Sequence, residues 1–139
     1  MTAEPAVGRW FGSYDAARVR AELLDHYVIE VGGEFAGWLG IEEETAEGFE
    51  HVGLDIGLVT VFQNQGYGPE ALRLAIRHHI DAGHRRFTID PRVDNARAIR
   101  VYERVGFQPV GVMRDYERGD DGTLHDGLLM DLLAAEFEG

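Results

Sequence analysis

The chain has 139 residues, of which 45% are hydrophobic, enough for one core but not for two ordinary domains. It has no cysteine, which excludes disulfides, a thiolate nucleophile and cysteine-ligated zinc. Its 13 basic residues, all arginine, face 25 acidic residues, and the formal net charge of −12 argues against a nucleic-acid partner because phosphates would be repelled. We therefore interpret residues 1–139 as one domain.

No run of about 18 apolar residues occurs, and the first ten residues lack the basic flank and apolar stretch of an export signal. These features predict a soluble, cytoplasmic protein with no membrane partner. The charge is uneven, since residues 66–104 carry eight arginines and five acids. This favours an anionic ligand near that segment and a cationic ligand elsewhere, although solvated helix faces on an acidic surface would give the same pattern.

The first predicted element is a helix over residues 14–25, which Ser13 caps. Residues 26–31 alternate as a strand does, and Gly32-Gly33 is a two-residue hairpin signal. Residues 34–43 are then the return strand. A polar turn leads from this hairpin to the next element.

Residues 51–62 are rich in β-branched side chains and are predicted to form one long strand. Apolar residues then recur at helical spacing up to about Ala82, with Gly83 where the helix should end. The helix carries the pair His78-His79. Neighbouring residues cannot share a helical face, so we expect one packed and one solvated histidine and no metal site.

A short strand over residues 85–90 and a helix over residues 95–105 follow, and Gly106 ends the helix. Residues 107–119 and 123–133 form a closing hairpin. Strands that alternate with helices in the middle, with hairpins at both ends, predict an α/β domain with a mixed sheet.

The segment Gly66-Tyr67-Gly68-Pro69 joins the long strand to the following helix. Such a junction exposes backbone N–H groups at the positive end of the helix dipole, which suits a phosphate group. Glycine allows close approach or an unusual φ, and Pro69 fits the first helical position. A plain tight turn would use the same residues, and the segment lacks the Gly-Lys-Ser/Thr end of a P-loop.

A second motif makes the interpretation specific. Gln63-x-x-Gly66-x-Gly68 is followed about thirty residues later by Asn95 and then by the sequence YERVGF at residues 102–107. This combination resembles the GNAT superfamily of acyl-CoA-dependent N-acyltransferases, over roughly residues 27–132. The resemblance implies a GNAT-like mixed, mostly antiparallel β-sheet flanked by helices, and acetyl-CoA as co-substrate.

The resemblance also assigns roles to residues. The loop that matches the coenzyme A pyrophosphate site is Gln63, Asn64, Gln65, Gly66, Tyr67 and Gly68. Asn95 would bind the pantetheine arm, and Tyr102 would lie near the thioester sulfur. Backbone N–H groups of Leu58, Val59 and Thr60 would stabilise the oxyanion.

Within the superfamily, residues 89–107 and the upstream GLDIGL are similar to aminoglycoside 6′-N-acetyltransferases. By this likeness Asp55 contacts the ammonium group of the substrate, and Asp90 matches another aspartate that faces the substrate. An acid that points inward from an apolar strand needs such a partner. Two alternatives stay open: Asp55 on the solvated face of the sheet, and Asp90 as a helix cap.

The predicted activity is acetyl transfer from acetyl-CoA to a primary amine, in which the neutral amine attacks the thioester directly because no cysteine exists to carry the acyl group. Asp55 would bind the ammonium group and help remove its proton, and Tyr102 would protonate the thiolate. A cationic small molecule such as an aminoglycoside is the expected acceptor. Acetylation of a protein or peptide N-terminus and a silent acyl-CoA sensor are the alternatives.

The segment before residue 27 is shorter than in typical members of this superfamily. Two interpretations follow: part of the acceptor-binding wall is missing, or a second subunit supplies it in a homodimer. Pro69 also removes one backbone donor just after the loop.

Overall fold

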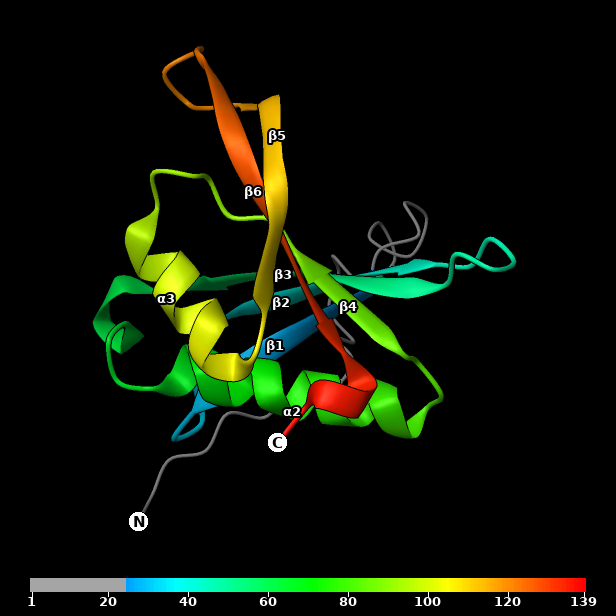
Figure 1. The fold of residues 1–139 in the computed structure, drawn as a ribbon. Coiled ribbons are helices and arrows are strands. Elements are labelled where there is room, and N and C mark those ends of the chain that lie inside the picture. The colour runs from blue at the N-terminus through cyan, green and yellow to red at the C-terminus, as the bar shows by residue number, and fades with distance from the viewer. Residues whose placement is uncertain (1–24) are drawn as a thin grey trace.

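Residues 25–139 are described in a computed structural model of the chain (Figure 1). The helix predicted over residues 14–25 lies outside the described residues, except that its last predicted residue, Asp25, begins the first strand. Within residues 25–139, no helix is both long and apolar enough to cross a membrane.

Six strands form one sheet in the order β1-β2-β3-β4-β6-β5. Only β3 and β4 run parallel, and all other neighbours are antiparallel. The predicted mixed, mostly antiparallel sheet is therefore confirmed. In sheet order the strands are β1 (Asp25–Val31), β2 (Glu34–Glu44), β3 (His51–Leu58), β4 (Arg86–Ile89), β6 (Leu124–Leu133) and β5 (Gln108–Arg118).

Within residues 25–139, the helices α2 (Tyr67–Asp81) and α3 (Ala96–Val105) flank the sheet, and two short 3₁₀ helices are present, η1 (Thr60–Phe62) and η2 (Ala134–Glu136) (Figure 1). The order of elements from β1 onward agrees with the prediction. The core lies between one sheet face and the helices, and α2 contributes the buried side chains of Ala71, Leu72, Ala75, Ile76 and His79.

The central strands bury every second residue, as the two-residue period of a strand requires. In β3, Val52 and Leu54 are buried in the core. Gly53 and Asp55 alternate with them and therefore lie on the opposite face. The register brings Asp55 opposite Gly40 of β2. This second face carries the acid that the sequence analysis selected.

The sheet opens between β3 and β4. Their pairing includes only Val52 with Phe87 and Gly53 with Thr88, whereas β3 continues to Leu58. The end of β3 therefore has no neighbouring strand on the β4 side. The predicted strand over residues 51–62 was four residues too long, because the chain bends after Leu58 into η1.

The start of α2 also differs from the prediction. Gly66 is the N-cap residue with φ of 85°, and the helix begins at Tyr67. Pro69 is thus the third helical residue rather than the first. It still lies in the first turn, where a backbone N–H has no partner within the helix. At the other end Gly83 has φ of 103°, which agrees with the predicted stop.

Candidate active site

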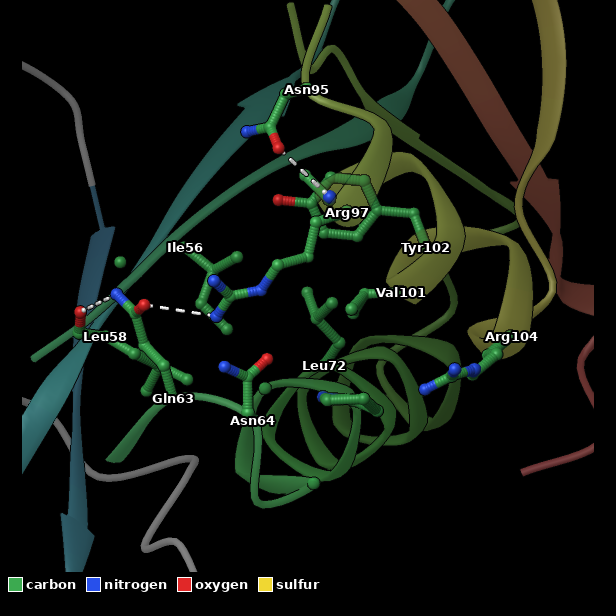
Figure 2. A pocket seen from close by; sticks show the side chains of 15 residues that line it. Ile56, Leu58, Gln63, Asn64, Leu72, Asn95, Arg97, Val101, Tyr102 and Arg104 are labelled. Carbon is green, nitrogen blue, oxygen red and sulfur yellow. Dashed lines mark hydrogen bonds between the residues drawn. The ribbon is translucent and has the colours of Figure 1, made fainter. Parts of the chain in front are cut away.

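A cavity of about 560 Å³ lies between the end of β3, the start of α2 and one side of α3 (Figure 2). The four parts of the chain that meet here are the end of β3, the loop after it, the first turns of α2 and one side of α3. The residues that line the cavity are Ile56, Gly57, Leu58, Gln63, Asn64, Gly66, Gly68, Pro69, Leu72, Asn95, Arg97, Ala98, Val101, Tyr102 and Arg104.

The two loop glycines have different functions in the structure. Gly66 has a left-handed φ of 85°, which disfavours any residue with a Cβ, and a Cβ there would meet no atom within 4 Å. Gly68 has an ordinary helical conformation, and a Cβ there would lie 3.5 Å from Cδ1 of Leu58. Gly66 therefore shapes the turn, and Gly68 leaves room in the cavity. Both expose the N-terminus of α2.

A hydrogen-bonded chain crosses the cavity from α3 to β3. Arg97 donates from Nη2 to Oε1 of Gln63 over 3.1 Å, and Gln63 donates from Nε2 to the Leu58 carbonyl over 3.0 Å (Figure 2). Arg104 lines the same cavity, one heptad after Arg97, so both guanidinium groups lie on one side of α3. The local excess of arginine in residues 66–104 indicated this charge, but the sequence analysis did not select these two residues.

Asn95 and Tyr102 both line the cavity from α3, as predicted. Asn95 is the N-cap residue, and its Oδ1 accepts a hydrogen bond from the Ala98 N–H over 3.1 Å. The Asn95 amide nitrogen is therefore the group left to donate to a ligand. Tyr102 is buried, and its ring makes an edge contact with Phe107 at a centroid distance of 6.4 Å.

The backbone N–H groups predicted to stabilise the oxyanion point in different directions at the end of β3. The Val59 N–H donates to the Ala36 carbonyl over 2.8 Å and is therefore used within the sheet. Successive N–H groups of a strand point to opposite edges, so the Leu58 N–H points toward the open edge beside the cavity. The Ile56 N–H points to the same edge but donates a hydrogen bond of 2.9 Å to Oδ1 of Asp55. Leu58 is therefore the backbone donor that the geometry favours.

Four of the predicted coenzyme-binding residues do not line the cavity. Val59 and Thr60 belong to the bend after β3, and Tyr67 packs its ring against Phe62 at 6.2 Å. Gln65 donates from Nε2 to the Val61 carbonyl over 2.7 Å and so stabilises the loop. The side chains of Gln65 and Tyr67 therefore stabilise the loop, Val59 and Thr60 are exposed, and Gln63, Asn64 and the two glycines line the cavity.

A second hollow of about 360 Å³ is lined by Gly53, Leu54 and Asp55 of β3, directly before the β3 residues that line the cavity. Asp55 and Asp90 both line it, together with Trp38, Thr88 and Tyr116. Asp55 is exposed, so the expectation of an inward acid in an apolar strand was wrong. The alternating pattern of β3 directs it away from the core and into this hollow.

Asp90 is not the cap of α3. Its Oδ2 accepts a hydrogen bond of 2.6 Å from the Tyr116 hydroxyl, whereas Asn95 caps the helix. The alternative of Asp90 as a helix cap was therefore wrong. The pKa of Tyr116 is raised to about 12, mainly by the hydrogen bond to Asp90 and to a smaller extent by partial burial. This phenol therefore remains a hydrogen-bond donor at neutral pH.

Tyr102 connects the two hollows electrostatically. Burial, together with the smaller effects of the Asp55 and Asp90 carboxylates, raises the pKa of its hydroxyl to about 12. The phenol is therefore protonated throughout the neutral range and is able to donate a proton.

The histidine pair behaves as the helical period predicts. His79 is buried and shares a 2.8 Å hydrogen bond between Nδ1 and the Ala75 carbonyl, while His78 is exposed. Desolvation lowers the pKa of His79. Among residues 25–139, no group of three or more histidine, aspartate or glutamate side chains is arranged to hold a metal ion.

Residues 4–107 match the acetyltransferase (GNAT) family. The chain belongs to this family. The predicted resemblance is thus confirmed at the level of the superfamily. The cavity residues suit the coenzyme A of the family: a glycine-lined helix N-terminus and two arginines for phosphates, and an amide from Asn95 for the pantetheine arm.

Solved structures with the same fold include ribosomal-protein acetyltransferases. RimL, the ribosomal L7/L12 alpha-N-protein acetyltransferase, in complex with coenzyme A is 26% identical, with a TM-score of 0.76 over 86% of this chain and 67% of that chain. The Salmonella typhimurium acetyl transferase that modifies the N-terminal serine of 50S ribosomal subunit protein L7/L12 is also 26% identical, with a TM-score of 0.75 over 86% of this chain and 69% of that chain.

Mycobacterium smegmatis RimJ in complex with CoA-disulfide, at 24% identity, shares the fold with a TM-score of 0.81 over 99% of this chain and 72% of that chain. A curated relative, the mycothiol acetyltransferase of Corynebacterium efficiens, is 35% identical over 52 residues. That match spans 37% of this chain and 18% of the relative's length. These comparisons give no support to the finer resemblance to aminoglycoside 6′-N-acetyltransferases.

Proposed function

We propose that this protein is an acetyl-CoA-dependent N-acetyltransferase that acts on the α-amino group at the N-terminus of a peptide or protein. The observation that carries the proposal is that consecutive residues of β3 line two hollows: the arginine-lined cavity at Ile56, Gly57 and Leu58, and the acidic hollow at Gly53, Leu54 and Asp55. The first suits an anionic coenzyme and the second an ammonium group. The likeness to RimL supports a peptide acceptor.

The residues of the cavity would bind three parts of the coenzyme: the phosphate groups, the pantetheine arm and the thioester. The N-terminus of α2, with Arg97 and Arg104, would bind phosphate groups. Asn95 would donate to the pantetheine arm, and the Leu58 N–H would donate to the carbonyl oxygen of the thioester, where negative charge develops during the reaction. Bound acetyl-CoA would supply the thioester carbon that the amine attacks.

The two residues with proton-transfer roles come from opposite sides of the site. Asp55 would hold the ammonium group and accept a proton from it, directly or through water, so that the neutral amine attacks. Tyr102 would donate its phenolic proton to the sulfur as the carbon–sulfur bond breaks. The hydroxyl carries its proton at neutral pH, and because its pKa is raised to about 12 it would give up this proton only as negative charge develops on the sulfur.

A small cationic amine is the second candidate acceptor. The observation that favours it is the presence of both Asp55 and Asp90 in the hollow, because two carboxylates suit a polycation better than a single ammonium group. Aminoglycosides and polyamines are the chemical class concerned.

The experiment is a panel assay of thiol release from acetyl-CoA. The acceptors would be short peptides with free amino termini, the same peptides N-acetylated, and a set of aminoglycosides and polyamines. We expect turnover with free peptides and none with their N-acetylated forms. Turnover restricted to aminoglycosides or polyamines would replace the peptide proposal by the second candidate. Tight acetyl-CoA binding without turnover of any amine would indicate a sensor and contradict the enzyme.

A further inference from the structure

The hydrogen bond between Tyr116 and Asp90 lies beside an irregular part of β5. Tyr116 lies on β5, and Asp90 follows β4, so 26 residues separate the partners of the 2.6 Å hydrogen bond. Both side chains line the acidic hollow. Tyr116 is not among the site residues predicted from the sequence, because nothing in its local sequence distinguishes it from an ordinary strand tyrosine.

An irregularity in β5 directs the Tyr116 side chain. The register of β5 and β6 shifts between Met113 and Glu117, so three residues of β5 lie opposite one residue of β6. Within this bulge Asp115 has a φ of 50°, a left-handed conformation that costs a residue with a Cβ of order 1 kcal/mol or more. Bulges next to active sites commonly redirect a side chain.

Asp126 of β6 links the bulge to the segment after Asp90. Its Oδ1 accepts a hydrogen bond of 2.9 Å from the Asp115 N–H, which stabilises the bulge. Its backbone carbonyl accepts a hydrogen bond of 3.0 Å from the Val93 N–H. The neighbouring Leu128 N–H donates to the Pro91 carbonyl over 2.8 Å. The same few residues of β6 therefore hold both partners of the Tyr116–Asp90 contact.

Gly127 provides the space for the tyrosine ring. A Cβ at this position would lie 2.7 Å from Cδ2 and 3.1 Å from Cγ of Tyr116, which is too close for any side chain. The ring therefore lies directly against the backbone of Gly127. Because its ring is held here, the hydroxyl reaches Asp90 from a fixed direction.

We propose that Tyr116 is a positioning residue for the acceptor: its hydroxyl fixes the Asp90 carboxylate in the acidic hollow, so that Oδ1 of Asp90 binds the protonated amine. Oδ2 is committed to Tyr116, which leaves Oδ1 as the oxygen that faces a ligand. Asp55 lines the same hollow and then receives the amine in one orientation. The proposal rests on the proposed function for the identity of the acceptor, but not for the existence of an amine site.

The experiment uses the full chain with Tyr116→Phe, Asp90→Asn and the double variant, and Val112→Thr as a control on the same strand. For the best acceptor of the wild type, we expect Tyr116→Phe to raise KM about tenfold, the loss expected for one hydrogen bond to a charged group. The kcat, the KM for acetyl-CoA and the melting temperature should change little. In the Asp90→Asn background the same substitution should have almost no effect on KM.

Gly127→Ala gives a second, independent variant, because its methyl group should displace the ring without removing the hydroxyl. We expect it to raise the acceptor KM as Tyr116→Phe does. Calorimetric titration of spermidine and of a free-amino peptide into each variant, with coenzyme A present, separates this inference from the proposed function. Amine binding that weakens in Tyr116→Phe would support it even if the wild type turned over no amine. Equal amine affinity in wild type and Tyr116→Phe, no measurable amine binding, or additive effects of Tyr116→Phe and Asp90→Asn would overturn it.

Discussion

Consecutive residues of β3 line two hollows of opposite charge. One is lined by arginines and backbone donors, and the other by carboxylates. The cavity beside α2 and α3 has arginines and backbone donors, and its loop is stabilised by hydrogen bonds that Gln63 and Gln65 make to nearby carbonyls. The hollow on the open face has the carboxylates of Asp55, in β3, and of Asp90, which directly follows β4. Because the two hollows have opposite charge, electrostatic attraction would direct the anionic coenzyme to one and the cationic amine to the other before either binds.

The difference also explains the position of Tyr102. It lies in the wall of the cationic cavity, yet the acids of the other hollow contribute to the high pKa of its hydroxyl. A hydroxyl that lines one hollow and whose pKa depends on the acids of the other is suited to the step in which the acetyl group passes from the coenzyme to the amine. The variants below test whether each hollow has the function that its charge suggests.

Tyr102→Phe should have the largest effect. It removes the proposed proton donor but keeps the ring that packs against Phe107, so the fold and the coenzyme affinity should be retained. We expect kcat to fall roughly 10²-fold, the usual scale for one general acid, or about tenfold if the thiolate leaves readily without help. Steady-state thiol release, with coenzyme affinity measured by calorimetry, checks this. Equal turnover in both proteins would remove Tyr102 from the chemistry.

Gly68→Val should selectively damage the cationic cavity. The position has an ordinary helical conformation, so the substitution adds volume at the α2 N-terminus without left-handed strain. Coenzyme A affinity should fall at least tenfold, about 1.4 kcal/mol or more, with little loss of thermal stability. Gly111→Val on β5, where a Cβ meets no atom within 4 Å, is the matched control. Unchanged affinity in Gly68→Val would mean that the glycine serves the turn alone.

Asp55→Asn should selectively damage the acidic hollow. We expect a several-fold rise in KM for a cationic acceptor and a lower kcat, with coenzyme affinity nearly intact, because the carboxylate interacts with the amine in both binding and proton transfer. Asp81→Asn, at the exposed end of α2, controls for the loss of one negative charge. A comparable defect with neutral and cationic acceptors would place Asp55 outside the acceptor site.

Arg97→Gln should have the smallest of these effects. Arg97 supports Gln63 and adds positive charge to the cavity, but it is exposed, so water and salt screen its attraction for phosphate groups. We expect coenzyme affinity to fall about threefold and to depend less steeply on salt than in the wild type. Arg77→Gln, whose guanidinium packs over the Phe137 ring, is the control. An unchanged salt dependence would argue against a phosphate contact for Arg97.

Much of the fold and half of the site follow from local sequence. Gly83 and Gly106 end their helices with positive φ, and Asn95 caps α3, because each of these effects depends on a few neighbouring residues. The position of the glycine loop was also predictable, since Gln63 to Gly68 is one continuous segment beside the start of a helix. Family resemblance added Tyr102 and the two acids, whose roles no local pattern defines.

Tertiary structure alone decided the rest. The sheet directs Asp55 to the open face, although its apolar neighbours suggested a buried position, because the two-residue period of β3 is fixed by which side of the strand packs on α2. The Val59 N–H is used by Ala36, a partner that depends on the register of β2. Arg97 reaches Gln63 across 34 residues of sequence and Tyr116 reaches Asp90 across 26, distances over which no pattern in one sequence specifies contact. A short segment thus determines its own turns and caps, whereas the pairing of strands decides which distant charges meet.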